Sequence, residues 1–134
     1  MIEHRLHLRA APEDVWRLLA TDAGRARFWA EESAEREGLV RLTFPNGLVE
    51  EMIVLEAEPP RRLALSYFGE RTELILEPDG SGGTDLHLRA EADDPDTNAG
   101  WVSVLMALKA AADFGADLRN HDPARTWDQG FVDN

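Results

Sequence analysis

Three side chains of types that transfer protons are the first candidates for chemistry: Glu51, His4 and Tyr67. Glu51 lies near the start of a strand-like run, in the phase predicted to face inward, where burial would make it a stronger base. His4 falls on the apolar phase of the first strand. If at least two of the three face one cavity, they can serve general acid–base catalysis. The alternatives are a glutamate at a solvated rim and a histidine satisfied in the core or at the sheet end.

Other catalytic and metal-binding patterns receive little support. Glu50 and Glu51 cannot act as a facing pair, because neighbours in a strand point to opposite faces. The glycine-rich run Asp79–Thr84 lacks the lysine and the following helix of a phosphate-binding loop, and it predicts a hairpin turn. The sequence has no cysteine, and no two of its histidines have helical metal-ligand spacing. We therefore predict no metal site and no cofactor.

Aromatic and aliphatic side chains at inward phases are candidates for the lining of a ligand cavity. Such cavities are mostly apolar, with a few placed polar groups, and tryptophan and tyrosine add a polar tip that needs a partner. The alternative is that these side chains simply fill the core. The predicted lining consists of Trp29, Phe44, Glu51, Ile53, Tyr67, Leu74, Trp101, Leu105 and Leu108.

Strands and short helices must position these candidates. Residues 2–10 alternate as a half-buried strand, and two short helical patterns follow, opening at Pro12 and at Thr21. The second pattern carries Phe28 and Trp29 near its predicted end. Residues 31–38 read as a loop or a ragged edge strand. Further strand-like runs follow at about residues 40–44, 48–57, 63–67, 72–76 and 84–90, with a hairpin signal at residues 45–47. The pattern predicts an antiparallel sheet with one buried face.

The run at residues 48–57 is ambiguous in phase, because Met52–Leu55 is apolar on both faces. The set containing Glu51, Ile53, Leu55 and Ala57 is the more apolar one, so it is predicted to face inward.

A helical pattern covers about residues 96–120, and its apolar stripe is what a concave sheet would cover. Residues 121–134 are polar apart from Trp127 and Phe131. This tail is predicted either to pack back on the domain or a second copy, or to be a disordered end.

Length and charge limit the class of protein. The 134 residues fit one domain, 1–134, with a core at about 2–120 and a tail at 121–134. The net charge of −12 disfavours nucleic acid, whose phosphates need a basic patch. No apolar run approaches the roughly 20 residues of a membrane helix, and the start lacks a signal peptide's apolar core. We expect a cytoplasmic protein that does not bind membranes.

Several separated motifs resemble one protein family. They are Ala10–Trp16, Phe28-Trp29, Val54–Leu63, Gly82-Gly83-Thr84, Gly100-Trp101 and Leu108-Lys109. In this order they resemble the Hsp90-ATPase-activator-homologue (AHSA1-like) branch of the START-like, Bet v 1-like (SRPBCC) superfamily, over about residues 2–120. The resemblance implies an α+β helix-grip fold: a curved antiparallel sheet wrapped around a long C-terminal helix, with two short helices after the first strand.

The resemblance also implies several functions without choosing among them, since its superfamily includes lipid and hormone carriers, polyketide cyclases and co-chaperone domains. Our leading hypothesis is a domain that binds a small apolar molecule in an internal cavity. One alternative is an enzyme of cyclase or dehydratase type, in which Glu51, His4 or Tyr67 supplies proton transfer. The other is an interaction module that contacts a chaperone or another protein. The interaction module predicts an exposed apolar patch of several hundred Å². A homodimer is compatible with each hypothesis.

Overall fold

One seven-stranded antiparallel sheet, in the order β1-β7-β6-β5-β4-β3-β2, organises the chain. The structure is a computed structural model that describes all residues 1–134. Its elements are β1 (Ile2–Leu8), α1 (Pro12–Ala20), α2 (Asp22–Arg25), β2 (Glu32–Arg36), β3 (Leu39–Thr43), β4 (Val49–Glu58), β5 (Arg62–Tyr67), β6 (Glu70–Pro78), β7 (Thr84–Ala90), α3 (Pro95–Phe114) and a 3₁₀ turn (Trp127–Gln129). None of the helices is long and apolar enough to cross a membrane.

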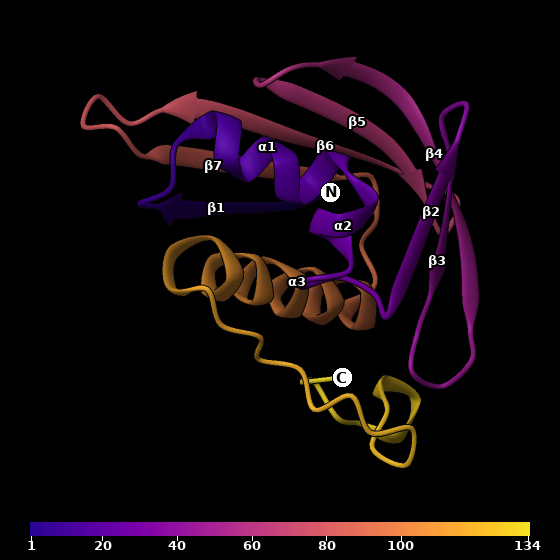
Figure 1. The fold of residues 1–134 in the computed structure, drawn as a ribbon. Helices are drawn as coiled ribbons and strands as arrows, with labels where there is room; N and C mark the ends of the chain where they lie inside the picture. The colour runs from indigo at the N-terminus through magenta and orange to yellow at the C-terminus, as the bar shows by residue number, and fades with distance from the viewer.

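The sheet curls around α3, so that β2, β3 and β4 stand at an angle to β1, β7 and β6 (Figure 1). Helices α1 and α2 lie on the same side of the sheet as α3, and the chain after α3 turns back along that helix. This arrangement confirms the predicted α+β helix-grip fold with two short helices after the first strand. The run at residues 31–38 contains the edge strand β2.

Alternation places apolar side chains of β1 and β7 on the inner face of the sheet and charged side chains on its outer face. β1 pairs with β7 so that Leu6 lies opposite Leu86 on the inner face. On the outer face the Arg89 Nε lies 3.1 Å from the Glu3 carboxylate, and the His87 ring lies 3.5 Å from the same oxygen. The outer face of this edge therefore carries a cross-strand charge network.

The predicted phase of β4 was wrong. Met52 is fully buried, whereas Glu51 is exposed and the Ile53 side chain is 47% exposed. The register with β3 explains this, because residues paired across strands share a face. Met52 pairs with the buried Val40 on the inner face, and Ile53 pairs with the exposed Leu39 on the outer face.

Leu55 and Ala57 are also exposed rather than inward, and the register shifts between Val54 and Glu56. Glu50, not Glu51, shares the inner phase, because it pairs with the buried Leu42. When both faces of a strand are apolar, the neighbouring strand decides which one is buried.

Helix α2 is shorter than predicted and packs closely on α1. The Thr21 side chain accepts a hydrogen bond from the Gly24 N–H at 3.0 Å, and the helix ends at Arg25. Phe28 and Trp29 therefore follow the helix rather than end it. A Cβ at Gly24 would lie 2.2 Å from the Arg17 carbonyl oxygen, so only glycine permits this approach of the two helices.

Replacing Gly24 with alanine is expected to lower the free energy of unfolding by about 2 kcal/mol, because the methyl group would force the two helix backbones apart. Denaturant unfolding followed by circular dichroism measures this. Gly100→Ala is the matched control: a Cβ there would meet its nearest atom, in Trp127, at 3.8 Å. That variant should be at least as stable as the parent chain. Equal losses in the two variants would contradict the argument.

Helix α3 ends at Phe114, six residues before the predicted end at residue 120. Gly115 adopts a left-handed conformation with φ of 60°, and its N–H bonds back to the helix carbonyls. The side chain of Asp113 is fully buried just before this point. It accepts the backbone N–H of Arg9 at 2.9 Å and of Ala10 at 3.1 Å, which ties the end of α3 to the β1–α1 turn.

Candidate ligand-binding pocket

A pocket of about 410 Å³ opens between α3, the β3–β4 turn, the β5–β6 turn and the tail. This volume is within the range of small-molecule sites. Eight of its sixteen lining residues are hydrophobic, and six of the sixteen are aromatic: Trp29, Phe44, Tyr67, Phe68, Trp101 and Trp127.

Three of these aromatic rings form a mutually packed cluster at the inner wall. The centroid distances are 5.4 Å for Trp29 and Tyr67, 5.9 Å for Trp29 and Trp101, and 5.3 Å for Tyr67 and Trp101. The Trp29 indole N–H donates a hydrogen bond to the Tyr67 hydroxyl at 3.2 Å. Burial raises the pKa of Tyr67, so the hydroxyl stays neutral. The Tyr67 hydroxyl oxygen thus satisfies the Trp29 indole N–H inside the cluster.

The β5–β6 turn carries the aromatic ring nearest the mouth. Phe68 has a positive φ of 49°, and its ring centroid lies 4.7 Å from that of Tyr67 and 6.5 Å from that of Phe44. The carboxylate of Glu50 accepts the Phe68 backbone N–H at 3.0 Å. Glu50 thus holds the turn that presents Phe68, and this is the role of an inward-phase glutamate in β4.

Polar side chains surround the aromatic wall: Asn46, Glu70, Asp96, Thr97, Ser103, Asp128 and Asn134. Asp128 accepts hydrogen bonds from the Thr126 hydroxyl and, at 3.2 Å, from the Asn46 amide. These bonds lower the pKa of Asp128. They also join the tail to the tip of the β3–β4 hairpin.

The tail packs back on the domain and forms part of the pocket wall (Figure 1). The Trp127 ring lies over Gly100 of α3, and the Ser103 hydroxyl donates a hydrogen bond to the Val132 carbonyl. Thr126 and Gln129 close a capping box around the 3₁₀ turn. Of the alternatives for the tail, the structure shows packing on the domain itself.

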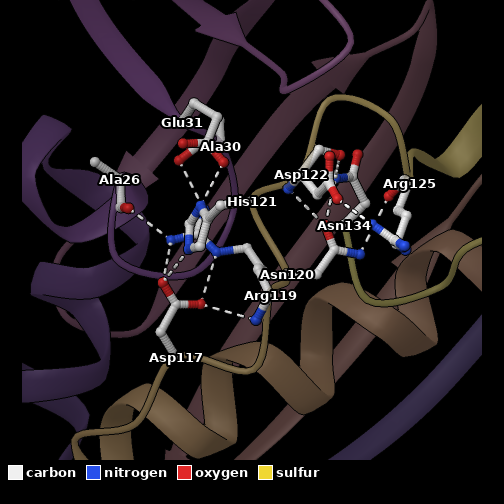
Figure 2. A network of polar contacts seen from close by, with 10 residues as sticks. All are labelled: Ala26, Ala30, Glu31, Asp117, Arg119, Asn120, His121, Asp122, Arg125 and Asn134. Carbon is white, nitrogen blue, oxygen red and sulfur yellow. Dashed lines mark hydrogen bonds and ion pairs between the residues drawn. The ribbon is translucent and has the colours of Figure 1, made fainter.

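A polar network anchors the start of the tail (Figure 2). The Arg119 guanidinium donates to the carbonyls of Ala30 and Ala26, at 2.8 Å each, and to the carboxylate of Asp117. His121 bonds Glu31 through Nδ1 and Asp117 through Nε2, the latter at 2.7 Å. The network fixes the chain after α3 to the segment between α2 and β2.

The His121 bridge makes the anchor dependent on pH. The hydrogen bond to Glu31, followed by that to Asp117, raises the pKa of His121 above its ordinary value of 6.5. A raised pKa stabilises the protein fully below the unfolded value, and this stabilisation is lost as the pH rises through the folded value. The docked tail is therefore held most firmly in mildly acidic solution.

We expect amide exchange in residues 127–130 to accelerate between about pH 6 and about pH 9 by more than the intrinsic chemical rate, as His121 loses its proton. His121→Gln should remove this excess, because glutamine does not titrate. His87→Gln is the control, since His87 lies on the outer face of β7, and it should keep the parent dependence. An unchanged excess in His121→Gln would contradict this role of the bridge.

The structure brings four predicted lining residues to the pocket: Trp29, Phe44, Tyr67 and Trp101. It places the others elsewhere. Leu74, Leu105 and Leu108 are buried within the hydrophobic core, and Glu51 and Ile53 lie on the outer face.

The three candidates for proton transfer do not meet. His4 lies outside the pocket, where its Nε2 is 2.6 Å from the Asn98 side-chain oxygen, and Glu51 is exposed on the far face of the sheet. Only Tyr67 lines the pocket. The arrangement that the enzyme hypothesis required is absent, and no group of three or more His, Asp or Glu side chains is placed to hold a metal ion.

Comparisons with known proteins give a clear result only at the level of structure. No protein-family model and no curated protein sequence matches the chain. The Aha1 dimer from Colwellia psychrerythraea gives a TM-score of 0.74 at 20% identity, covering 85% of this chain and 96% of the other.

Two further solved structures agree. The AHSA1-like protein from Aeromonas hydrophila gives a TM-score of 0.67 at 18% identity, covering 81% of this chain and 88% of the other. CalU16 from Micromonospora echinospora gives a TM-score of 0.65 at 27% identity, covering 81% of this chain and 71% of the other. TM-scores between 0.65 and 0.74 over more than 80% of this chain support one conclusion: this chain has the helix-grip fold of the Aha1 and AHSA1-like structures.

Proposed function

We propose that the chain binds a small apolar or amphipathic molecule in the aromatic pocket. The observation that carries this proposal is the open space of about 410 Å³ whose wall contains six aromatic side chains. Ligand pockets have this character: mostly apolar walls, few polar groups and a preformed shape. The proposal fits a fold whose helix and sheet enclose space between them.

The aromatic rings at the mouth support it. Phe68 is 50% exposed and Trp127 is 38% exposed, although both line the pocket. A ligand that covers this aromatic surface removes it from water, which favours binding by about 25 cal/mol per Å² of apolar area. A bound ligand would therefore cover two large side chains that the free protein leaves half in solvent.

Tyr67 supplies the group that would orient the ligand. Its oxygen accepts the Trp29 N–H, and the hydroxyl proton has no acceptor in the protein. Because burial keeps this hydroxyl neutral, it remains a donor over the whole physiological range. A carbonyl, ether or hydroxyl oxygen of the ligand would satisfy it.

A thermal-shift screen tests the proposal with a set of neutral, cationic and anionic apolar compounds, followed by titration of the intrinsic tryptophan fluorescence. Trp29, Trp101 and Trp127 all line the pocket, so a ligand there should change the emission. We expect saturable stabilisation by at least one class. Failure of every class to raise the melting temperature or to alter the fluorescence would overturn the proposal.

A second candidate function, contact with a chaperone or another protein, is favoured by the outer face of β3 and β4. Leu39 pairs with Ile53 there, and Leu55 lies further along β4; these side chains are 41%, 47% and 43% exposed. Apolar side chains gathered on a sheet surface mark interaction sites. An Hsp90 ATPase assay tests this candidate, and an unchanged rate on adding the chain would count against it.

A further inference from the structure

The buried lining residues of the pocket are aromatic, whereas exposed lining residues at its rim include acidic side chains. Trp29 and Trp101 are buried, whereas Asp96 and Asp128 are exposed and Glu70 is half-buried. The three carboxylates come from α3, the tail and β6, so three separate elements direct acidic groups to one opening. No lysine, arginine or histidine lines the pocket.

These carboxylates are not neutralised by the protein. Glu70 and Asp96 form no ion pair, although carboxylates elsewhere in the structure, such as Asp22, Asp113 and Asp117, are paired with arginine or lysine. The partners of Asp128 are the neutral groups of Thr126 and Asn46. The protein therefore places no cation against the rim carboxylates, and the net charge of −12 adds to the negative potential there.

The aromatic wall favours the same sign of ligand charge. The faces of tryptophan, tyrosine and phenylalanine carry negative electrostatic potential and attract ammonium groups, the basis of recognition by aromatic cages. Glu70 lies directly across from Tyr67 in the β5–β6 pairing. A carboxylate and an aromatic face thus stand side by side at the same position in the pocket.

The N-terminus of α3, which would otherwise attract an anion, is already capped. The Asp94 carboxylate accepts the Thr97 backbone N–H at 3.2 Å and the Thr97 hydroxyl at 3.0 Å. This removes the feature of the pocket rim most suited to a fatty acid or phosphate.

We propose that the ligand of this pocket is an organic cation: an apolar body held by Trp29, Tyr67 and Trp101, with an ammonium group at the rim facing Glu70, Asp96 and Asp128. This inference rests on the proposed function and specifies its ligand class. The rim repels anionic amphiphiles of the same shape, so charge selects among molecules that the aromatic wall alone would accept.

Calorimetric titration of the full chain with three probes of similar shape tests the inference. They are phenylbutyl-trimethylammonium, the neutral phenylpentanol and the anionic phenylpentanoate. At low salt we expect the cation to bind about tenfold more tightly than the alcohol, and the anion to bind most weakly. Added salt should reduce the difference between cation and alcohol, because the rim is open to solvent.

A charge-neutralised variant and its control identify the groups responsible. Glu70→Gln combined with Asp96→Asn should remove most of the difference in affinity between the cation and the alcohol. Asp85→Asn combined with Glu91→Gln makes the same change in net charge at exposed acids outside the pocket. This control should keep the parent preference.

The outcomes separate the two proposals. If the alcohol binds as tightly as the cation, or if the rim variant keeps the preference, the inference on charge is overturned and the proposed function stands. If none of the three probes binds, the inference is overturned, and the broader compound screen decides the proposed function.

Discussion

Val104→Trp is expected to weaken ligand binding at least about a hundredfold, equivalent to about 2.7 kcal/mol, while the chain stays folded. Val104 is half-buried on α3 and lines the pocket. An indole at this position would fill space that the ligand needs and would pack against rings already present. The loss should therefore come from exclusion of the ligand and not from unfolding.

Fluorescence titration with the compound that gives the largest thermal shift measures this loss, and the melting temperature checks the fold. Val102→Trp is the matched control, because Val102 lies on the same helix, is 43% exposed and does not line this pocket. That control should bind as the parent does. Parent affinity in Val104→Trp would place the ligand elsewhere.

Asp113→Ala is expected to destabilise the chain by about 4 kcal/mol, the largest stability loss that we predict. The carboxylate is fully buried and accepts two backbone N–H groups and the Lys109 ammonium, which lies 3.3 Å away. Truncation would leave the Arg9 and Ala10 N–H groups without this acceptor, and each such unmade bond costs about 1–3 kcal/mol. Both β1 and the end of α3 would lose their connection.

The charge of Asp113 also has a pH signature. Burial raises the pKa of Asp113. The hydrogen bonds from the Arg9 and Ala10 N–H groups and the nearby Lys109 ammonium lower it by more, so the net direction is downward. A lowered pKa gives stability that is present above the unfolded value and is lost as the pH falls through the folded value. The acid sensitivity of the parent should therefore be reduced in Asp113→Ala.

Denaturant unfolding near neutral and acidic pH tests both statements. Asp85→Ala is the control, because Asp85 is exposed and unpaired on the outer face of β7, and it should stay within about 0.5 kcal/mol of the parent. A loss of similar size in both variants would contradict the anchoring role of Asp113.

The fold could be predicted because its signals are local. Two-residue alternation, the proline at the start of α1 and the turn residues each act over a few positions, and they agree with one another. The phase of β4 could not be predicted in this way, because both of its faces are apolar and the register with Val40 and Leu42 decides between them.

The depth of the pocket was predictable, and its rim was not. Tyr67 and Trp101 belong to a strand and a helix whose inward phase can be counted from the sequence. Phe68 and Trp127 lie in a turn and in the tail, where no period indicates the direction of a side chain. The glycine turns mark where the chain reverses, and only the three-dimensional arrangement shows that the β3–β4 turn meets the tail.

Under the proposed function, the construction of the pocket wall would set the timescale of ligand exchange. The inner wall belongs to the hydrophobic core, whereas the outer wall is a tail that meets the β3–β4 turn through Asp128 and meets α3 through Trp127 and Val132. Segments of this kind open with a free energy below that of global unfolding. Residence time and equilibrium stability would then be governed by different residues, so substitutions in the tail could change how long a molecule stays without changing how firmly the domain is folded.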